Sequence, residues 1–199
     1  MVSGNPSPFL RLFIALAVPP EVREEIGRAQ GRLRRDAPPG AIRWTRPDQF
    51  HVTVKFLGDI PSAQLAALES SVSRVCAGCP ALRLSARGIG FFPNEQRPRV
   101  IWVRADDAGG RMAELHRRLD EAMGPSAPVE KPEKFTGHIT LGRFRPGRHA
   151  AIEKLLDRAT VFRDRQFGEW QAGTVEIVRS ELTATGAMHT PLASCPLAC

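Results

Sequence analysis

The chain has 199 residues, of which 42% are hydrophobic and 25% are charged, and its formal net charge is +7. This length is usual for one domain with a substantial core, and the ordinary composition without low-complexity tracts excludes a disordered or fibrous protein. The basic excess favours anionic partners such as RNA or phosphate esters, although the arginines are scattered along the chain.

The first half of the chain predicts alternating strands and helices after a loose tail at residues 1–8. An apolar strand at 10–17 precedes a helix from Pro19-Pro20 to about Arg35, because proline suits the first turn of a helix. Apolar residues at helical spacing predict a second helix at 62–76. Strands are expected at 42–44, 51–57, 82–87 and 100–105, with Gly58-Asp59 ending the second of them and a turn-rich stretch at 88–98.

The second half repeats this order with variations. Helices are expected at 112–123 and 150–159, a loop at 124–133, and strands at 138–144, 174–183 and 188–192. The repeat predicts an α+β fold of two similar lobes related by a pseudo-twofold axis. Each lobe is an antiparallel sheet with helices on its outer face, and a central cleft lies between the lobes. Residues 9–199 are expected to form this single bilobal domain.

Two tetrapeptides share one pattern: His51-Val52-Thr53-Val54 and His138-Ile139-Thr140-Leu141. With five His and nine Thr in the chain, chance would give about 0.2 His-x-Thr matches. On a strand, His and Thr two residues apart share one face while the apolar residues point to the other. Two such strands facing each other would place two imidazoles and two hydroxyls around one small cavity. The alternative is a pair of unrelated, half-exposed histidines.

This set of groups suits hydrolysis of a phosphodiester without a metal. One neutral imidazole can act as base and one imidazolium as acid, because histidine titrates near neutrality. Thr53 and Thr140 can donate to the phosphate oxygens, and Arg143 could add a charge-assisted contact. In an ideal strand Arg143 would point away from His138, so this role requires a local bulge; the alternative is a surface salt bridge.

No metal or other cofactor is expected. Cys76-x-x-Cys79 and Cys195-x-x-x-Cys199 invite a zinc interpretation, but the gap between the pairs is far longer than in compact zinc modules, and reduced thiols are favoured. The apolar run 12–18 is too short to span a bilayer, and no basic segment precedes it as in a signal peptide. A cytoplasmic protein without a membrane partner is therefore expected.

The motifs and their context resemble a known family. The chain is similar to the 2H phosphoesterase superfamily, named for two His-x-Thr-x motifs, and most closely to its RNA 2′,3′-cyclic phosphodiesterases, also called 2′-5′ RNA ligases. The resemblance covers most of the chain. Its segments are residues 11–16, Trp44, 51–58, 90–93, 99–102, 138–143, 179–182 and 190–192.

The resemblance implies opening of a terminal 2′,3′-cyclic phosphate to a 2′-phosphate. It implies His51 as proton donor and His138 as proton acceptor, with both threonines holding the phosphate. Phe56 falls where the family carries an aromatic residue associated with base stacking, whereas strand alternation would bury it beside Val52 and Val54. Two positions depart from the family pattern: Gly137 replaces a proline, and His189 replaces a tyrosine.

Other functions stay open at this point. The same acid and base could cleave or ligate 2′-5′ linkages, since ligation reverses attack on the cyclic phosphate. A non-catalytic module that only binds RNA ends would keep the same fold. The expected partner is RNA or a nucleotide with a 2′,3′-cyclic phosphate, bound by a monomer.

Overall fold

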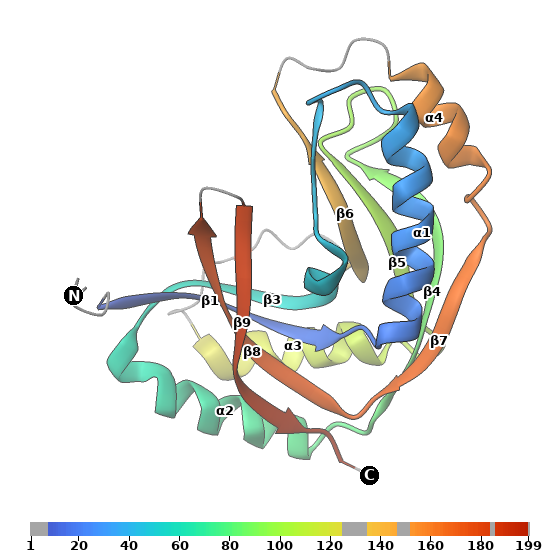
Figure 1. Ribbon diagram of the computed structural model, residues 1–199. Coiled ribbons are helices and arrows are strands. Elements are labelled where there is room, and N and C mark those ends of the chain that lie inside the picture. The colour runs from blue at the N-terminus through green and yellow to red at the C-terminus, as the bar shows by residue number, and fades with distance from the viewer. Residues whose placement is uncertain (1–7, 125–134, 147–151, 184–185, 199) are drawn as a thin grey trace.

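The computed structural model describes residues 8–124, 135–146, 152–183 and 186–198, and their strands form one curled antiparallel sheet (Figure 1). The strand order is β7-β4-β5-β6-β3-β1-β8-β9, and the short β2 pairs with β6. The strands are β1 (Phe9–Ala17), β2 (Ile42–Trp44), β3 (His51–Pro61), β4 (Leu82–Phe92), β5 (Val100–Asp107), β6 (His138–Phe144), β7 (Gln166–Ala172), β8 (Thr174–Thr183) and β9 (Gly186–Pro196). Most of the expected tail and of the expected loop at 124–133 lies outside the described residues.

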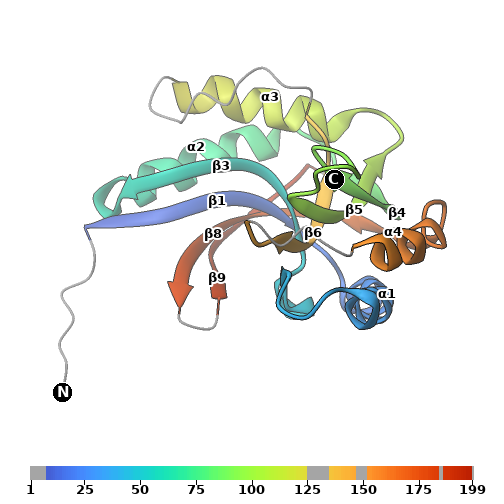
Figure 2. The ribbon, with the colours of Figure 1, turned by 90° about the horizontal axis from the view of Figure 1, so that it is seen from above.

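Helices cover the outer face of the sheet in two pairs. They are α1 (Pro20–Asp36), α2 (Leu65–Ala77), α3 (Arg111–Met123) and α4 (Glu153–Thr160). Helices α1 and α4 pack together against the half that contains β4 and β7, whereas α2 and α3 pack together against β3, β8 and β9. Figure 2 shows the two pairs on separate parts of the molecule. The predicted α+β class with two similar lobes is confirmed.

The two lobes are not the two halves of the sequence. The order β1-α1-β3-α2 is matched by β5-α3-β6-α4, and the motif strands β3 and β6 meet at the centre of the sheet. Yet α1 follows β1 and packs against β7 of the other lobe, and α3 follows β5 and packs against β3. Each lobe is therefore covered in part by a helix that follows, in the sequence, a strand of the other lobe.

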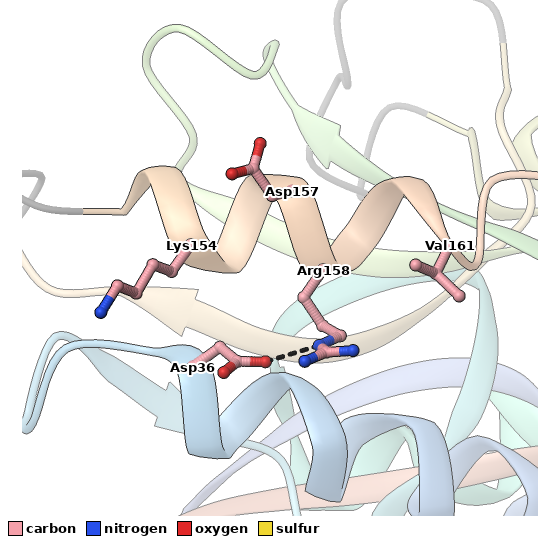
Figure 3. Close-up of a pocket in the computed structure, with 5 residues that line it drawn as sticks. All are labelled: Asp36, Lys154, Asp157, Arg158 and Val161. Carbon is pink, nitrogen blue, oxygen red and sulfur yellow. Dashed lines mark hydrogen bonds and ion pairs between the residues drawn. The ribbon is translucent and has the colours of Figure 1, made fainter.

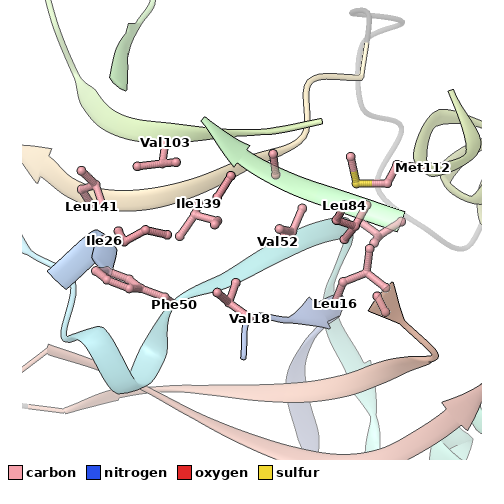
Figure 4. Packing of buried hydrophobic residues seen from close by; sticks show 14 of the residues in the cluster. Leu16, Val18, Ile26, Phe50, Val52, Leu84, Val103, Met112, Ile139 and Leu141 are labelled. Atoms are coloured by element: carbon pink, nitrogen blue, oxygen red, sulfur yellow. The ribbon is translucent and has the colours of Figure 1, made fainter. Parts of the chain in front are cut away.

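The core runs through both lobes without a break. Val52 and Ile139, from the two motif strands, are fully buried and belong to the same cluster as Ile26 of α1 and Met112 of α3. Figure 4 shows their side chains gathered in this cluster. Burial of these apolar residues fixes which face of each motif strand remains for the histidines and threonines.

Two strands continue past glycines that the sequence interpretation took as their ends. Strand β3 runs on to Pro61 and β4 to Phe92, so the expected ends at Gly58-Asp59 and before the 88–98 stretch are wrong. Gly58 and Gly88 have φ angles of 71° and 67°, and the strand register shifts beside each of them. Glycine in this left-handed conformation forms a bulge inside a strand and does not terminate it.

Three further boundaries differ from the expectation. Strand β7, between α4 and β8, was not expected, and β9 extends well beyond the predicted 188–192 on both sides. Helix α4 begins at Glu153, and part of the expected helix start at 150 lies outside the described residues.

Candidate active site

The two motif strands meet at one residue pair, Val52 with Ile139 in antiparallel register. Continuing this register by one residue in each direction sets His51 opposite Thr140 and Thr53 opposite His138. Residues opposite each other in an antiparallel pair share a face, with Cβ atoms about 5 Å apart. All four side chains are half-buried, whereas the residues between them are fully buried. The imidazoles and hydroxyls thus gather on the inner face of the sheet.

Both motif strands contain a bulge directly after the motif threonine. The register of β1 with β3 skips Val54, and the register of β5 with β6 skips Leu141. A bulge adds one residue and reverses the alternation beyond it. Consequently Phe56 and Arg143, each five residues after a motif histidine, return to the inner face and are exposed.

These two bulges settle two placements that the sequence left open. Arg143 requires a bulge to lie on the side of His138, and that bulge is present. Phe56 is 48% exposed, so the expectation that it packs in the core beside Val52 and Val54 is wrong. It contacts Phe13 across β1 and β3, with ring centroids 6.1 Å apart.

A helix holds each bulge from the outer side. His116 of α3 donates its Nδ1 hydrogen to the carbonyl of Val54 over 2.7 Å. Gln30 of α1 donates from Nε2 to the carbonyl of Leu141 over 2.9 Å, and to that of Thr45 over 2.7 Å. Carbonyl groups freed by a bulge need donors when buried. The two lobes meet this need in the same way, through a polar side chain of the helix that covers the strand.

Lys55 adds an ion pair beneath the first bulge. Its side chain is only 2% exposed and pairs with Asp120 of α3, which also lies 3.3 Å from His116 Nε2. A buried ammonium group needs such a partner. Lys55 therefore ties β3 to α3 on the face opposite the histidines.

Both ring nitrogens of His51 lie within hydrogen-bond distance of a neighbouring oxygen. Its Nδ1 atom lies 2.8 Å from the carbonyl of Gln49 and must carry a hydrogen there, because a carbonyl only accepts. Its Nε2 atom lies 3.1 Å from the hydroxyl of Thr53. Burial lowers the pKa of His51 to about 4, and the charges of His189, His138 and Arg143 act in the same direction.

His138 has the same arrangement in the other lobe. Its Nδ1 atom donates to the carbonyl of Thr136 over 2.9 Å, which leaves Nε2 as the free nitrogen. Burial and the charge of Arg143 lower its pKa. Each histidine is thus oriented by the carbonyl two residues before it, and in each Nε2 is the ring nitrogen that this carbonyl does not engage.

Aromatic side chains that the sequence interpretation did not assign to the site surround both histidines. The rings of Phe13 and His189 lie 4.8 and 5.0 Å from that of His51. The rings of Phe92 and Trp102 lie 5.1 and 6.1 Å from that of His138. In the sequence, His189 stands out only as a departure from the family pattern, and its place in the predicted strand 188–192 is the signal that could have pointed to the site.

Other features of the described residues lie apart from the motif strands. A hollow between α1 and α4 is lined by Asp36, Lys154, Asp157, Arg158 and Val161, and an Arg158–Asp36 ion pair of 2.7 Å crosses it (Figure 3). Among the described residues no three His, Cys, Asp or Glu side chains are grouped as a metal ion would require. No helix in the described ranges is long and apolar enough to cross a membrane.

The described cysteines are buried free thiols. They are Cys76, Cys79 and Cys195. Burial, together with the two other thiols, raises the pKa of Cys76 to about 12. A thiol of this kind stays protonated and is a poor nucleophile.

Comparison with known proteins identifies the family. Residues 16–102 match the family model described as LigT like phosphoesterase. A curated RNA 2′,3′-cyclic phosphodiesterase of Thermus thermophilus is 34% identical over 189 residues, covering 92% of this chain and 88% of the relative. The chain belongs to the LigT-like phosphoesterase family. The resemblance expected from the motifs is confirmed.

Other LigT-like proteins agree with this assignment. The RNA 2′,3′-cyclic phosphodiesterase of Methanocaldococcus jannaschii is 27% identical and covers 90% of this chain and 96% of its own length. The crystal structure of a Thermus thermophilus protein superposes with a TM-score of 0.75 at 30% identity, covering 94% of this chain and 98% of that one. The E. coli LigT structure in complex with 3′-AMP has a TM-score of 0.72 at 23% identity, covering 95% and 98%, and shares the fold.

Proposed function

We propose that this LigT-like protein hydrolyses RNA or nucleotide 2′,3′-cyclic phosphates to 2′-phosphates, using two histidines and no metal. The observation that carries the proposal is the meeting of both His-x-Thr motifs at the Val52–Ile139 pair, on one face of the sheet. The name shared by the curated relatives supplies the substrate class.

The reaction needs one base and one acid on opposite sides of phosphorus. His138 Nε2 takes a proton from water as the water oxygen forms a bond to phosphorus. The bond between phosphorus and the ribose 3′ oxygen breaks, and His51 Nε2 gives its proton to that oxygen. The 2′-phosphate remains on the product. The assignment of His51 as acid and His138 as base follows the family pattern.

The neighbouring side chains stabilise charge and position the substrate. Thr53 and Thr140 donate to the non-bridging oxygens, whose negative charge grows in the transition state. Arg143 adds a charge-assisted contact to the same phosphate. Phe56, exposed on the same face, offers its ring for stacking with the base.

Single and double substitutions of the histidines test the scheme. His51→Ala and His138→Ala should each reduce kcat roughly 10²–10⁴-fold, the usual loss for a general acid or base. The double variant should lose far less than the product of the two factors, because groups that act as one unit are not additive. Turnover of a nucleoside 2′,3′-cyclic phosphate is the measurement, and thermal unfolding verifies that each variant folds.

The product and the effect of chelation complete the test. ³¹P NMR should show a 2′-phosphate, and EDTA should leave the rate unchanged. A 3′-phosphate product would mean that the acid and base assignments must be exchanged, or that the substrate binds in the opposite orientation. Loss of activity in EDTA, restored by Zn²⁺ or Mn²⁺, would contradict the metal-free scheme. Binding without turnover by the wild-type protein would instead identify an RNA-end binding module.

A further inference from the structure

A pair of arginines lies on the inner face just beyond the motif histidines. Arg43 of β2 and Arg143 of β6 are direct partners in antiparallel register. Both are exposed, and the paired residues beside them, Ile42 and Phe144, are buried on the core side. The two guanidinium groups therefore share the inner face. Like charges placed directly opposite in a sheet repel each other and destabilise it.

Neither arginine has an acidic partner among the described residues. Partial desolvation of its guanidinium group and the charge of Arg43 lower the pKa of Arg143, as expected for one cation facing another. Ten other arginines of the described ranges do form ion pairs with carboxylates: 28, 46, 83, 87, 117, 118, 158, 163, 165 and 179. Paired guanidinium groups without a carboxylate are suited to bind a phosphate.

The arginine pair lies within reach of the reacting phosphate but is not centred on it. Beyond the bulge at Leu141, Arg143 lies on the same face as the motif histidines, and its charge lowers the pKa of both His51 and His138. Arg43 lies beyond it, on a different strand. Arg143 lies three positions after Thr140 in β6, which is about 10 Å of strand, less the shortening at the bulge.

We propose that Arg43, together with Arg143, binds the phosphodiester that precedes the terminal nucleotide of an RNA. This inference rests on the proposed function and extends it. The substrate class is then an oligonucleotide with at least one internal phosphate, and a nucleoside 2′,3′-cyclic phosphate fills only part of the site. The RNA strand leaves the histidines along β6 towards β2.

The opposite direction is the alternative path for the RNA. Arg104 is the direct partner of His138 in β5, and Arg87 is the partner of Arg104 in β4. However, Arg87 already lies 3.6 Å from Asp164. Arg43 and Arg143 have no such carboxylate partner among the described residues, so the Arg43 side is the less neutralised.

A comparison of two substrates distinguishes binding of the internal phosphodiester from binding of the cyclic phosphate. The rate is measured with uridine 2′,3′-cyclic phosphate and with a dinucleotide that ends in the same group. Arg43→Gln should leave kcat/KM for the nucleoside substrate unchanged and lower it for the dinucleotide about tenfold, the value of one charge-assisted contact. Arg143→Gln should lower both. Arg104→Gln, the matched control on the other path, should leave the ratio of the two kcat/KM values unchanged.

Binding at different salt concentrations gives a second measurement. The probe is a dinucleotide 2′-phosphate, and log Kd is followed against log salt. Each phosphate contact to a single strand contributes about 0.7 to this slope, so Arg43→Gln should reduce it by about that amount. Thermal unfolding verifies that the variant folds.

The outcomes distinguish failure of this inference from failure of the proposed function. Equal rates of wild type and Arg43→Gln on the dinucleotide, or an equal loss on both substrates, would overturn the inference. A selective dinucleotide defect in Arg104→Gln, with none in Arg43→Gln, would place the RNA on the opposite path. If the wild type hydrolyses neither substrate, the proposed function fails, and the binding measurement still tests the arginine pair.

Discussion

The two motif histidines combine equal local geometry with an environment that disfavours their charged forms. Each donates from Nδ1 to the carbonyl two residues earlier, so the chain itself sets the tautomer. Burial lowers the pKa of both, and that of His51 to about 4. An acid with so low a pKa is mostly deprotonated at neutral pH in the free protein. A bound phosphate would raise the pKa of His51, because a nearby negative charge favours the imidazolium.

The pH dependence should therefore differ between free protein and complex. The profile of kcat/KM reports the free protein and that of kcat the complex. Because phosphate raises both histidine pKa values, the bell-shaped kcat profile should lie at higher pH than the kcat/KM profile. Steady-state kinetics of a nucleoside 2′,3′-cyclic phosphate between about pH 4 and pH 9 measure both.

Arg143→Gln supplies the control for this shift. Its charge lowers the pKa of both histidines in the free protein, so its removal should move the kcat/KM profile to higher pH. Coincident kcat and kcat/KM profiles in the wild type would show that phosphate does not lie beside the imidazoles.

At the scale of elements, the bulges decide what the motif strands present. Without them Phe56 and Arg143 would point towards the helices, because strand side chains alternate between faces. Gln30 and His116 hold the two bulges from α1 and α3. Gln30 and His116, on the outer side of the sheet, thus help to position residues on its inner face.

Gln30→Met tests this support. Methionine has a similar shape but no donor, so the carbonyls of Leu141 and Thr45 each lose a hydrogen bond. The expected loss is about 1–3 kcal/mol in the free energy of unfolding, the cost of leaving a buried polar group unsatisfied. Denaturant unfolding measures it, and Gln171→Met, at an exposed position of β7, should change little. Equal stability of the two variants would contradict a supporting role for Gln30.

Periodic elements could be predicted from the sequence, but their irregularities could not. Strands β6 and β8 have the expected bounds, because each alternates cleanly between buried and half-exposed residues at its start. Strand β7 was missed since Glu169, Gln171 and Gly168 weaken its pattern at the edge of the sheet. Gly58 and Gly88 indicate equally a turn or a bulge, and only the partner strands decide between them.

The candidate site shows the same division. The motif pattern alone identified its histidines and threonines as a group. His189 and Phe13 lie far from His51 in the sequence. The contact of Phe13 with His51 depends on the pairing of β1 with β3, and that of His189 also needs the pairing of β1 with β8 and of β8 with β9. The bulge at Leu141 is held by a helix more than a hundred residues earlier. Such contacts are set by tertiary structure, which local patterns do not contain.

At the scale of the whole molecule, the exchange of helices makes the lobes depend on each other. Helix α1 follows β1 of one lobe but buries its apolar face against the other lobe. Helix α3 follows β5 of that second lobe and packs against the lobe that contains β1. The consecutive strands β7 and β8 also lie in different lobes. Neither lobe can bury its core without a helix that is connected in the sequence to a strand of the other lobe.

The protein should accordingly unfold in one cooperative transition, as the expected single domain at 9–199 requires. Calorimetric and van't Hoff enthalpies should agree. Ile139→Ala, at the centre of the shared core, should lower the free energy of unfolding by about 2–5 kcal/mol and keep one transition. Val161→Ala, at a side chain that is 64% exposed, should change it by less than about 0.5 kcal/mol. Two separate transitions, with only one shifted by Ile139→Ala, would mean that the lobes fold independently in spite of their exchanged helices.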